Sequence, residues 1–566
     1  MPDKDFPGIG ECQNITHHAP NWDDRGRIYW KDIQTQHRSL NAKARCFLPP
    51  EKIIPVIFIP GVMGSNLMSS GGELDDGEVI WRGDGILSVY KKWAALRGEE
   101  RRKLLNPDVT KVDNRGDISS NIYSPISDDG KSSFGTLLPS RRSRGWGEAL
   151  ALSYGKPLSV LQAALLDDWQ KGLMRRVSGK EALSEKPKEN GIVRQLCSEL
   201  LQTEDKTEAP LSEQEVEHFS QFLYPLHVFG YNWLQDNALS AAHLIEYIEK
   251  VLTNYNIRGT HGHGLAVEKV ILVTHSMGGL VARYASQVLG AKDKILGVVH
   301  GVIPDLGSPA AYRRMNVGAK QEGMPGQVMG NSAEDLMPVL ARAPGPLQLL
   351  PSPRYKYGAP WLWIKKGAED GRDLQLPQFR DPFAEIYLNQ TMWWKLYEPK
   401  IIDKDKKIIE KNWANYTRLI DRPVRKFISS LDKFGYHPTT YVFYGNKKSS
   451  DGFLKWDITF NTYPKNTHES DKKLANNQRE VPLSYNRSHT YQLYSSSTPG
   501  DGTVPVESLS TIKTNNGGAI KSVLATDVDH QGAYDVASLA DIHQRPALKF
   551  TLRAIAKMVQ EVPSPR

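Results

Sequence analysis

The chain has 566 residues, of which 39% are hydrophobic and 24% charged, and this composition excludes a disordered protein and exceeds one average domain in length. The net charge of +8 is modest for this length, and without an arginine-rich arm or an aromatic–basic repeat it argues against a nucleic-acid partner. Three cysteines with no CxxC pair argue against a disulfide framework and a cysteine–histidine zinc site.

Residues 1–50 are polar, lack a clear period and form a predicted N-terminal extension. The opening stretch MPDKDFPGIGECQNITHHAP has no apolar segment of the kind found in secretory signal peptides. No run approaches the ~18 apolar residues of a membrane-spanning helix. We therefore expect the chain to be made in the cytoplasm without a Sec signal, so that action elsewhere needs another export route.

The next segments alternate between buried strands and helices. IIPVIFIPG, FLYPLHVFGYNW and VEKVILVTHS are predicted strands, and helical spacing follows the second and the third in ALSAAHLIEYIEKVLTNY and GGLVARYASQVLG. This alternation predicts an α/β fold with a mostly parallel, doubly wound sheet and helices on both faces. The predicted core has a first part at 51–304, which contains an insertion at about 70–222. A cap or lid insertion at 305–435 and a second core part at 436–566 follow.

The stretch VTHSMGG places Ser276 between a buried strand and a helix. This is the context of a nucleophile elbow, the strained strand-to-helix turn that exposes a serine hydroxyl at the top of the sheet. Gly278 meets the need for a small residue there, whereas Thr274 is larger than the glycine of the usual motif. The alternative is that Ser276 only caps the helix. We interpret it as the nucleophile.

A nucleophilic serine needs a histidine and an acid, which follow it in chain order in α/β hydrolases. Asp501, in the turn STPGDGTVP, lies 225 residues after Ser276, and His530, in ATDVDHQG, lies 29 residues after Asp501. We predict that His530 takes the serine proton and that Asp501 fixes its tautomer. The weaker candidates for these roles are His543, Asp527 and Asp529.

The oxyanion formed during ester cleavage needs two backbone N–H donors. One should belong to Met277, the residue after the serine. The other should come from the loop PGVMGSN after the first buried strand, from Val62 or Met63. An ordinary glycine turn is the alternative for this loop.

Taken together, PVIFIPGVMGSNL, YNW, VTHSMGGLVARY, GSP, GDGTVP and DHQG resemble, in this order, the lipases of the lecithin:cholesterol acyltransferase and GPI-inositol deacylase group. The resemblance implies an α/β hydrolase that cleaves lipid esters with a Ser-Asp-His triad. Because no leader or anchor is evident, the chain is also similar to bacterial type VI secretion lipase effectors. That likeness implies a secreted antibacterial phospholipase that acts at the membrane or periplasm of a target cell. It also implies an immunity protein and a secretion-system component as partners.

Two features of the insertions leave alternatives open. The aromatic runs WLW and TMWWKLY could form a lid surface at a membrane interface or the core of a subdomain. The triad chemistry needs no cofactor and no metal, although the acidic loop GGELDDGE offers oxygen ligands to calcium when it is not simply solvated. The competing functions are acyl transfer to an alcohol acceptor and a catalytically inactive hydrolase fold that serves as a binding module.

Overall fold

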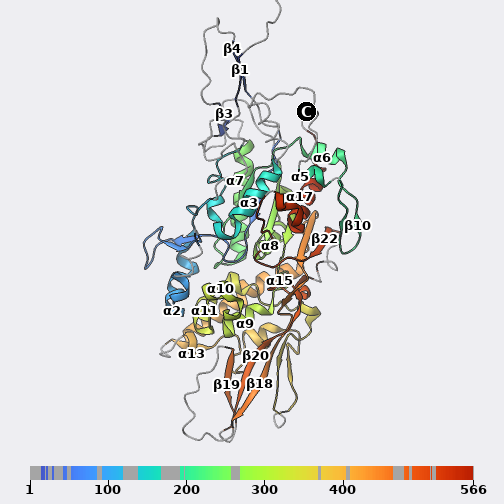
Figure 1. Cartoon of the computed structure of the whole chain (residues 1–566). Coiled ribbons are helices and arrows are strands. Elements are labelled where there is room, and N and C mark those ends of the chain that lie inside the picture. The colour runs from blue at the N-terminus through green and yellow to red at the C-terminus, as the bar shows by residue number, and fades with distance from the viewer. Residues whose placement is uncertain are drawn as a thin grey trace, which may run out of the picture.

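The computed structural model arranges the chain around one central sheet, with the N-terminal strands and a second sheet at opposite ends (Figure 1). No helix in the part that the structure describes is long and apolar enough to cross a membrane. The described residues are 14–18, 21–22, 28–30, 42–46, 52–83, 85, 92–118, 138–166, 192–196, 198–256, 268–367, 371–402, 408–462, 477–483, 487–509, 512, 518–538 and 540–564.

The central sheet has six strands in the order β11-β5-β12-β13-β16-β22, and every neighbouring pair is parallel. Strands that are buried on both faces need continuous apolar runs, and VIFI of β5 is such a run. The predicted α/β fold is therefore confirmed. The strands are β5 (Val56–Ile59), β11 (Leu226–Val228), β12 (Val270–His275), β13 (Ile295–Gly301), β16 (Thr440–Gly445) and β22 (Ile520–Thr526).

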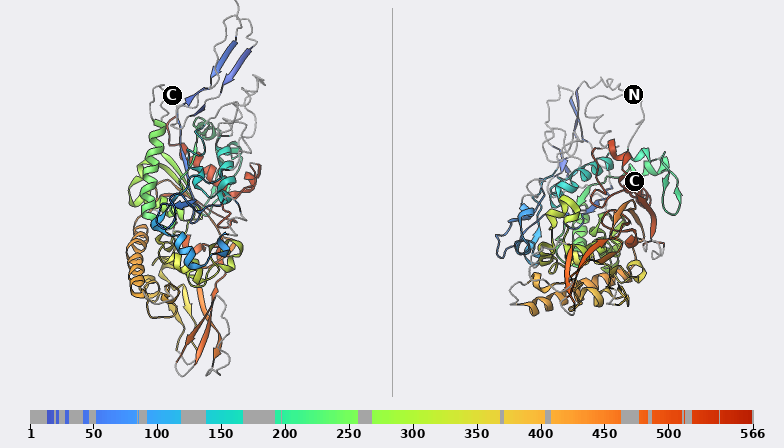
Figure 2. Two further views of the ribbon diagram at one scale, coloured as in Figure 1. Left: turned by 90° about the vertical axis from the view of Figure 1, so that its left-hand side faces the viewer. Right: turned by 60° about the horizontal axis from the view of Figure 1, so that its bottom comes forward.

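Alternate residues of each strand enter separate apolar cores on the two faces of the sheet. In β5, Ile57 and Ile59 join one core, whereas Val56 and Phe58 join the other. One face is covered by α7 (Asn237–Asn256) and α8 (Met277–Arg283). The other is covered by α3 (Ala151–Leu165), α6 (Glu213–Phe219) and α17 (Pro546–Val559), as Figure 2 lets the reader follow.

A second, five-stranded sheet has the order β15-β14-β18-β20-β19 and lies at the far end of the molecule from the N-terminal strands (Figure 1). It joins strands on both sides of residue 435, the predicted end of the cap, because β14 pairs with β18. The strands are β14 (Leu362–Ile364), β15 (Leu374–Leu376), β18 (Leu454–Thr462), β19 (Gln478–Pro482) and β20 (Ser488–Ser495).

Helices of the 305–435 segment pack between the two sheets (Figure 1). They are α9 (Pro309–Val317), α10 (Gly323–Met329), α11 (Ala333–Leu340), α12 (Pro344–Leu347), α13 (Pro399–Ile402), α14 (Ile409–Leu419) and α15 (Arg425–Lys433). The aromatic runs of this segment are packing residues, since Trp361, Trp394 and Tyr397 are buried in the main core. Of the two alternatives for these runs, burial favours the core of a subdomain over a membrane-facing lid.

The remaining elements are short. The N-terminal extension contributes two two-stranded sheets, β1 (Asn14–His18) with β4 (Ala42–Cys46) and β2 (Asn21–Trp22) with β3 (Ile28–Tyr29). The others are β6 (Leu67–Ser69), β7 (Val79–Trp81), α2 (Gly98–Leu104), β8 (Thr110–Val112), α5 (Ile192–Gln195), β9 (Leu201–Gln202), β10 (Thr207–Glu208), β17 (Lys448–Ser450), β21 (Thr498–Gly500) and α16 (Val506–Leu509).

Candidate active site

Ser276 lies at the sharp turn between β12 and α8, in the middle of the central sheet. Its backbone has φ 52° and ψ −128°, a region that side-chain-bearing residues rarely occupy. A Cβ at Gly278 would come within 2.5 Å of the carbonyl oxygens of Ile59 and Pro60, so only glycine fits against β5. The Ser276 side chain makes no capping hydrogen bond to α8, which argues against the helix-cap alternative.

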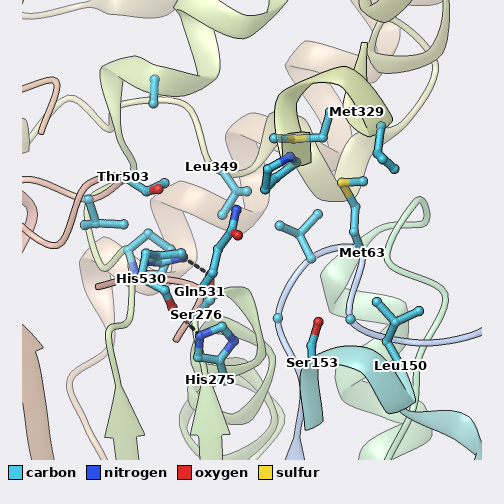
Figure 3. Close-up of a pocket in the computed structure, with 18 of the residues that line it drawn as sticks. Met63, Leu150, Ser153, His275, Ser276, Met329, Leu349, Thr503, His530 and Gln531 are labelled. Atoms are coloured by element: carbon cyan, nitrogen blue, oxygen red, sulfur yellow. Dashed lines mark hydrogen bonds between the residues drawn. The ribbon is translucent and has the colours of Figure 1, made fainter. Parts of the chain in front are cut away.

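The structure brings Ser276, His530 and Asp501 together in one hydrogen-bonded row. Ser276 Oγ lies 2.8 Å from His530 Nε2, and His530 Nδ1 lies 2.7 Å from Asp501 Oδ2 (Figure 3 shows the first of these contacts). The three residues are 3%, 9% and 1% exposed, respectively. A hydroxyl within hydrogen-bond reach of an imidazole that a buried carboxylate orients is the arrangement that activates a serine.

Asp501 is held by the turn that follows β21. Its Oδ1 accepts hydrogen bonds from the backbone N–H groups of Thr503, at 2.9 Å, and Val504, at 2.6 Å. The N–H of His530 donates to the Asp501 carbonyl oxygen at 2.8 Å, so the two loops are also joined through their backbones. One carboxylate oxygen is thereby occupied by the turn, and the other faces the imidazole.

The weaker candidates have other contacts. Asp527 pairs with Lys448 at 3.5 Å on the surface, and Asp529 accepts the N–H of Gly532 at 2.7 Å. His543 lies on the short helix Ala540–Gln544, away from the contacts of Ser276. The geometry therefore favours Asp501 and His530 over these alternatives.

The candidate oxyanion donors border the same space as Ser276. Met277 is the first residue of α8, and N–H groups in the first turn of a helix have no intrahelical acceptor. Val62 and Met63 follow β5 and line the cavity above the serine. Within the described residues, their N–H groups donate to no backbone carbonyl. Met63 has φ 62°, so this loop is conformationally strained as well.

His275 and Tyr154 join this site without having been predicted as functional residues. His275 Nδ1 lies 2.8 Å from Tyr154 Oη, and its Nε2 lies 2.7 Å from the His530 carbonyl oxygen. Burial lowers the pKa of His275 to about 4, with the neighbouring His530 as a second cause. His275 is therefore a neutral hydrogen-bonding residue at ordinary pH. The sequence could have indicated His275, because it is adjacent to the serine, whereas nothing in the local sequence distinguishes Tyr154.

The position of Thr274 has its own explanation. Its Oγ1 lies 3.0 Å from His300 Nδ1 in the buried core, where a larger residue than glycine finds a polar partner. Burial lowers the pKa of His300 to about 3, so this imidazole is neutral as well. The departure from the glycine of the usual motif is thus accommodated by a buried hydrogen bond to the neighbouring strand β13.

An apolar cavity of about 470 Å³ opens above Ser276 (Figure 3). Its wall includes the loop after β5, the start of α3, and the helices α9 and α10. Thr503 and Gln531 add polar groups near His530. A smaller cavity of about 80 Å³ shares Met63 and Met329 with it. The apolar lining residues include Val62, Met63, Trp81, Leu150, Leu152, Ala311, Met324, Val328, Met329 and Leu349.

The acidic loop that offered oxygen ligands to calcium has a different contact. Asp76 lies 2.6 Å from Lys111 Nζ, and this exposed pairing lowers the pKa of the carboxyl group. Within the described ranges, no group of three or more histidine, cysteine, aspartate or glutamate residues is arranged to hold a metal ion.

The chain is similar to known proteins at two levels. Residues 192–322, which include β12, the elbow and β13, match the family model of the PGAP1-like alpha/beta domain. The whole structure is similar to a chain in the crystal structure of the Tle4–Tli4 complex, with a TM-score of 0.71 and 27% identity over 90% of this chain and 99% of that one. A search of the curated proteins gives no match. The two likenesses confirm the resemblance that the motifs indicated.

Proposed function

We propose that this α/β hydrolase, with its PGAP1-like segment, is a serine phospholipase that cleaves acyl ester bonds of phospholipids through an acyl-enzyme. One observation carries the proposal. Ser276 Oγ, 2.8 Å from His530 Nε2, lies at the base of an apolar cavity of about 470 Å³. The activated hydroxyl supplies the nucleophile, and the cavity offers an apolar environment to an acyl chain.

Acylation follows from the positions of these groups. Ser276 Oγ attacks the ester carbonyl carbon while its proton passes to His530 Nε2, and Asp501 stabilises the imidazolium. The N–H groups of Met277 and of Val62 or Met63 stabilise the negative oxygen of the tetrahedral intermediate. When the intermediate collapses, the bond to the alcohol breaks and His530 returns the proton to the leaving oxygen. The lysophospholipid departs, and the acyl group stays on Ser276.

Deacylation uses the same groups in reverse. Water gives one proton to His530 Nε2 and attacks the acyl carbon, and a second tetrahedral intermediate forms. The bond to Ser276 Oγ then breaks, the serine regains its proton from His530, and a free fatty acid leaves. No redox change occurs at any step, and no further reactant besides water is consumed.

Two surface properties support a lipid surface as the place of action. Met324 on α10 and Leu152 on α3 line the cavity and are 59% and 48% exposed, so apolar side chains border its mouth. The net charge of +8 favours encounter with anionic headgroups. Exposed apolar groups at a cavity mouth together with positive charge suit a membrane interface.

We extend the proposal to the biological setting. The chain is similar over nearly its whole length to one solved in the Tle4–Tli4 complex, which supports a protein partner for this chain as well. The proposed role is that of a secreted antibacterial lipase, acting in the periplasm or membrane of a target cell and restrained in the producer by an immunity protein. We expect the wild type to be toxic when it is expressed in the periplasm, and Ser276→Ala to be harmless there.

The decisive experiment compares purified wild type with Ser276→Ala on mixed phospholipid vesicles, with products identified by mass spectrometry. We expect a fatty acid and a lysophospholipid from the wild type and neither from the variant. Acyl esters of an added alcohol in place of fatty acid would instead support acyl transfer. No release from any lipid by a wild type whose melting temperature equals that of the variant would contradict the phospholipase proposal and favour a binding module.

A further inference from the structure

A buried chain of hydrogen bonds leads from the loop after β5 to the backbone of His530. The Gly61 N–H donates to Tyr154 Oη at 3.1 Å, and Tyr154 Oη lies 2.8 Å from His275 Nδ1. His275 Nε2 lies 2.7 Å from the His530 carbonyl oxygen. Four residues that are up to 469 positions apart in the sequence, from Gly61 to His530, are therefore joined without an intervening gap.

The direction of each hydrogen bond in this chain is fixed by chemistry. A carbonyl oxygen only accepts, so Nε2 of His275 must carry the proton that it donates to His530. A neutral imidazole then has an accepting Nδ1, and Tyr154 must donate to it while accepting from Gly61. Burial supports these protonation states, since it lowers the pKa of His275 to about 4 and raises that of Tyr154.

This chain of hydrogen bonds from Gly61 through Tyr154 and His275 to His530, the relay, has little freedom to shift. A Cβ at Gly61 would lie 2.9 Å from both His275 Nδ1 and Ser276 Cβ, and one at Gly64 would lie 2.9 Å from Tyr154 Oη. The rings of Tyr154 and His275 meet edge to face, with centroids 5.6 Å apart. The loop after β5 therefore packs directly against the Tyr154 and His275 side chains (Figure 3 shows His275 beside Ser276 and His530).

We infer that Tyr154 and His275 are positioning residues, which fix the His530 imidazole and the oxyanion loop at Val62 and Met63 relative to each other around Ser276. The inference rests on the proposed function, because it assigns His530 the role of general base. Proton transfer and oxyanion binding both depend on placement to within about 1 Å, and an error of that size costs up to about a hundredfold in rate. Because the relay sets both placements, disturbing it should lower kcat and leave KM unchanged.

The relay also gives α3 a role beyond packing. Tyr154 belongs to the segment at 70–222 that is inserted into the core, and α3 covers the face of the sheet opposite α8. Its phenol passes between β5 and the elbow to reach His275. The insertion would then support the active site through a side chain that borders the cavity and is hydrogen-bonded to Gly61 and His275, one step removed from Ser276 Oγ and His530 Nε2.

The test uses Tyr154→Phe, His275→Gln, His275→Phe and the double variant Tyr154→Phe/His275→Phe, each in the full chain. Tyr154→Phe removes the hydroxyl that joins Gly61 to His275 and keeps the ring. His275→Gln keeps an amide that can donate to the His530 carbonyl, and His275→Phe removes both hydrogen bonds. Tyr534→Phe is the matched control, because Tyr534 also packs on His275 but donates to the Thr274 carbonyl, at 3.0 Å.

Two rates are measured for each variant: kcat and KM on phospholipid micelles, and the rate at which a fluorophosphonate labels Ser276. In that labelling the Ser276 oxygen bonds to phosphorus, fluoride leaves, and the proton passes to His530. We expect Tyr154→Phe and His275→Phe to lower kcat and the labelling rate about tenfold to a hundredfold at unchanged KM. His275→Gln should recover part of the loss. Tyr534→Phe should lower the melting temperature and leave both rates as in the wild type.

The double variant Tyr154→Phe/His275→Phe separates a relay from two independent packing effects. Members of one relay act together, so the double variant should be no slower than the slower single variant. The inference would be overturned if the loss of kcat in the double variant equalled the product of the two single losses. It would also be overturned if the variants raised KM without lowering kcat, or if Tyr534→Phe lost as much activity as they do. A wild type that labels normally but hydrolyses no phospholipid would refute the proposed substrate and still test the relay. A wild type that is not labelled at all would refute both.

Discussion

At the scale of single residues, the site depends on a carboxylate with two separate tasks. Asp501 Oδ1 accepts two backbone N–H groups, whereas Oδ2 faces His530 Nδ1 at 2.7 Å. The turn therefore holds the carboxylate in the orientation in which its second oxygen accepts the His530 Nδ1–H.

Replacing Asp501 with asparagine should lower kcat by about 10⁴, the loss seen when other triads lose this carboxylate. An amide nitrogen facing Nδ1 would favour the wrong tautomer of His530 and would not stabilise its charged form. Steady-state hydrolysis of a soluble ester measures the effect. Asp529→Asn is the control and should keep the wild-type rate, because the Asp529 carboxylate accepts the Gly532 N–H rather than facing His530 Nδ1; an equal loss there would point to a different acid.

The buried neutral His275 makes a prediction about stability and pH. Its pKa is about 4 in the folded chain and 6.5 as a free group, so below pH 6.5 the unfolded chain binds the extra proton. Its contribution to stability is therefore complete above pH 6.5 and is lost as the pH falls toward 4. Relative to His275→Gln, wild type should lose about 1.4 kcal/mol per pH unit in that window. Urea unfolding of both proteins measures this, and a pH-independent difference would contradict it.

Local sequence identifies some site residues and not others, for a physical reason. Ser276, Asp501 and His530 each stand in a turn after a strand, and turns have residue preferences that a sequence shows directly. Tyr154 lies in the first turn of a long apolar helix, where nothing local distinguishes it from a packing residue. It becomes notable only once β5 and β12 are adjacent, and that depends on the whole fold.

At the scale of elements, the elbow depends on how closely α8 approaches β5. A methyl group at Gly278 would lie 2.5 Å from two carbonyl oxygens of the β5 end, and backbone atoms there cannot yield without moving the strand. The same strand end leads into the loop of Val62 and Met63. A displacement of α8 would thus move the serine and one candidate oxyanion donor together.

Gly278→Ala should therefore lower the free energy of unfolding by about 1–3 kcal/mol, the usual cost of overpacking, and should also lower kcat. Gly435→Ala is the matched control, because its added Cβ meets no atom within 4 Å. Urea denaturation and ester hydrolysis are measured on both. A Gly278→Ala protein with wild-type stability would show that the helix and strand are less tightly packed than in the structure.

Sequence patterns predicted central strands such as β5 and β12, but not β14 and β15 of the second sheet. Buried parallel strands are continuous apolar runs, which VIFI and VILVTH display. By contrast, β14 and β15 have three residues each, and β14 pairs with β18 about 90 positions later in the chain. Strands this short have no period to detect, and their pairing is set by contacts that are remote in sequence.

At the scale of the whole molecule, one buried arginine ties the elbow helix to the end of the 305–435 segment. Arg283 of α8 pairs with Asp305 at 2.7 Å and donates to the carbonyl oxygens of Phe434 and Gly435. Tyr436 donates to the other oxygen of Asp305 at 2.6 Å. The core and the segment that walls the cavity are thereby joined through a charge pair.

Arg283→Met should cost about 3–5 kcal/mol of unfolding free energy, because Asp305 would remain buried without its charged partner. Lys294→Met, which removes a half-exposed partner of Glu249, should cost less than about 1 kcal/mol. Urea unfolding measures both. Similar small losses in the two variants would show that the segment is held to the core mainly by apolar contacts.

The order of strands in the central sheet has a consequence for synthesis on the ribosome. Val56 of β5 pairs with Leu226 on one side and with Ile271 on the other, so its second partner is translated 215 residues later. At about 5–20 residues per second, the VIFI strand keeps at least one open edge for about 10–40 s after it is made. During that time an apolar strand with an unpaired edge is exposed to other chains. We therefore expect the yield of folded protein to depend on chaperones that bind nascent chains.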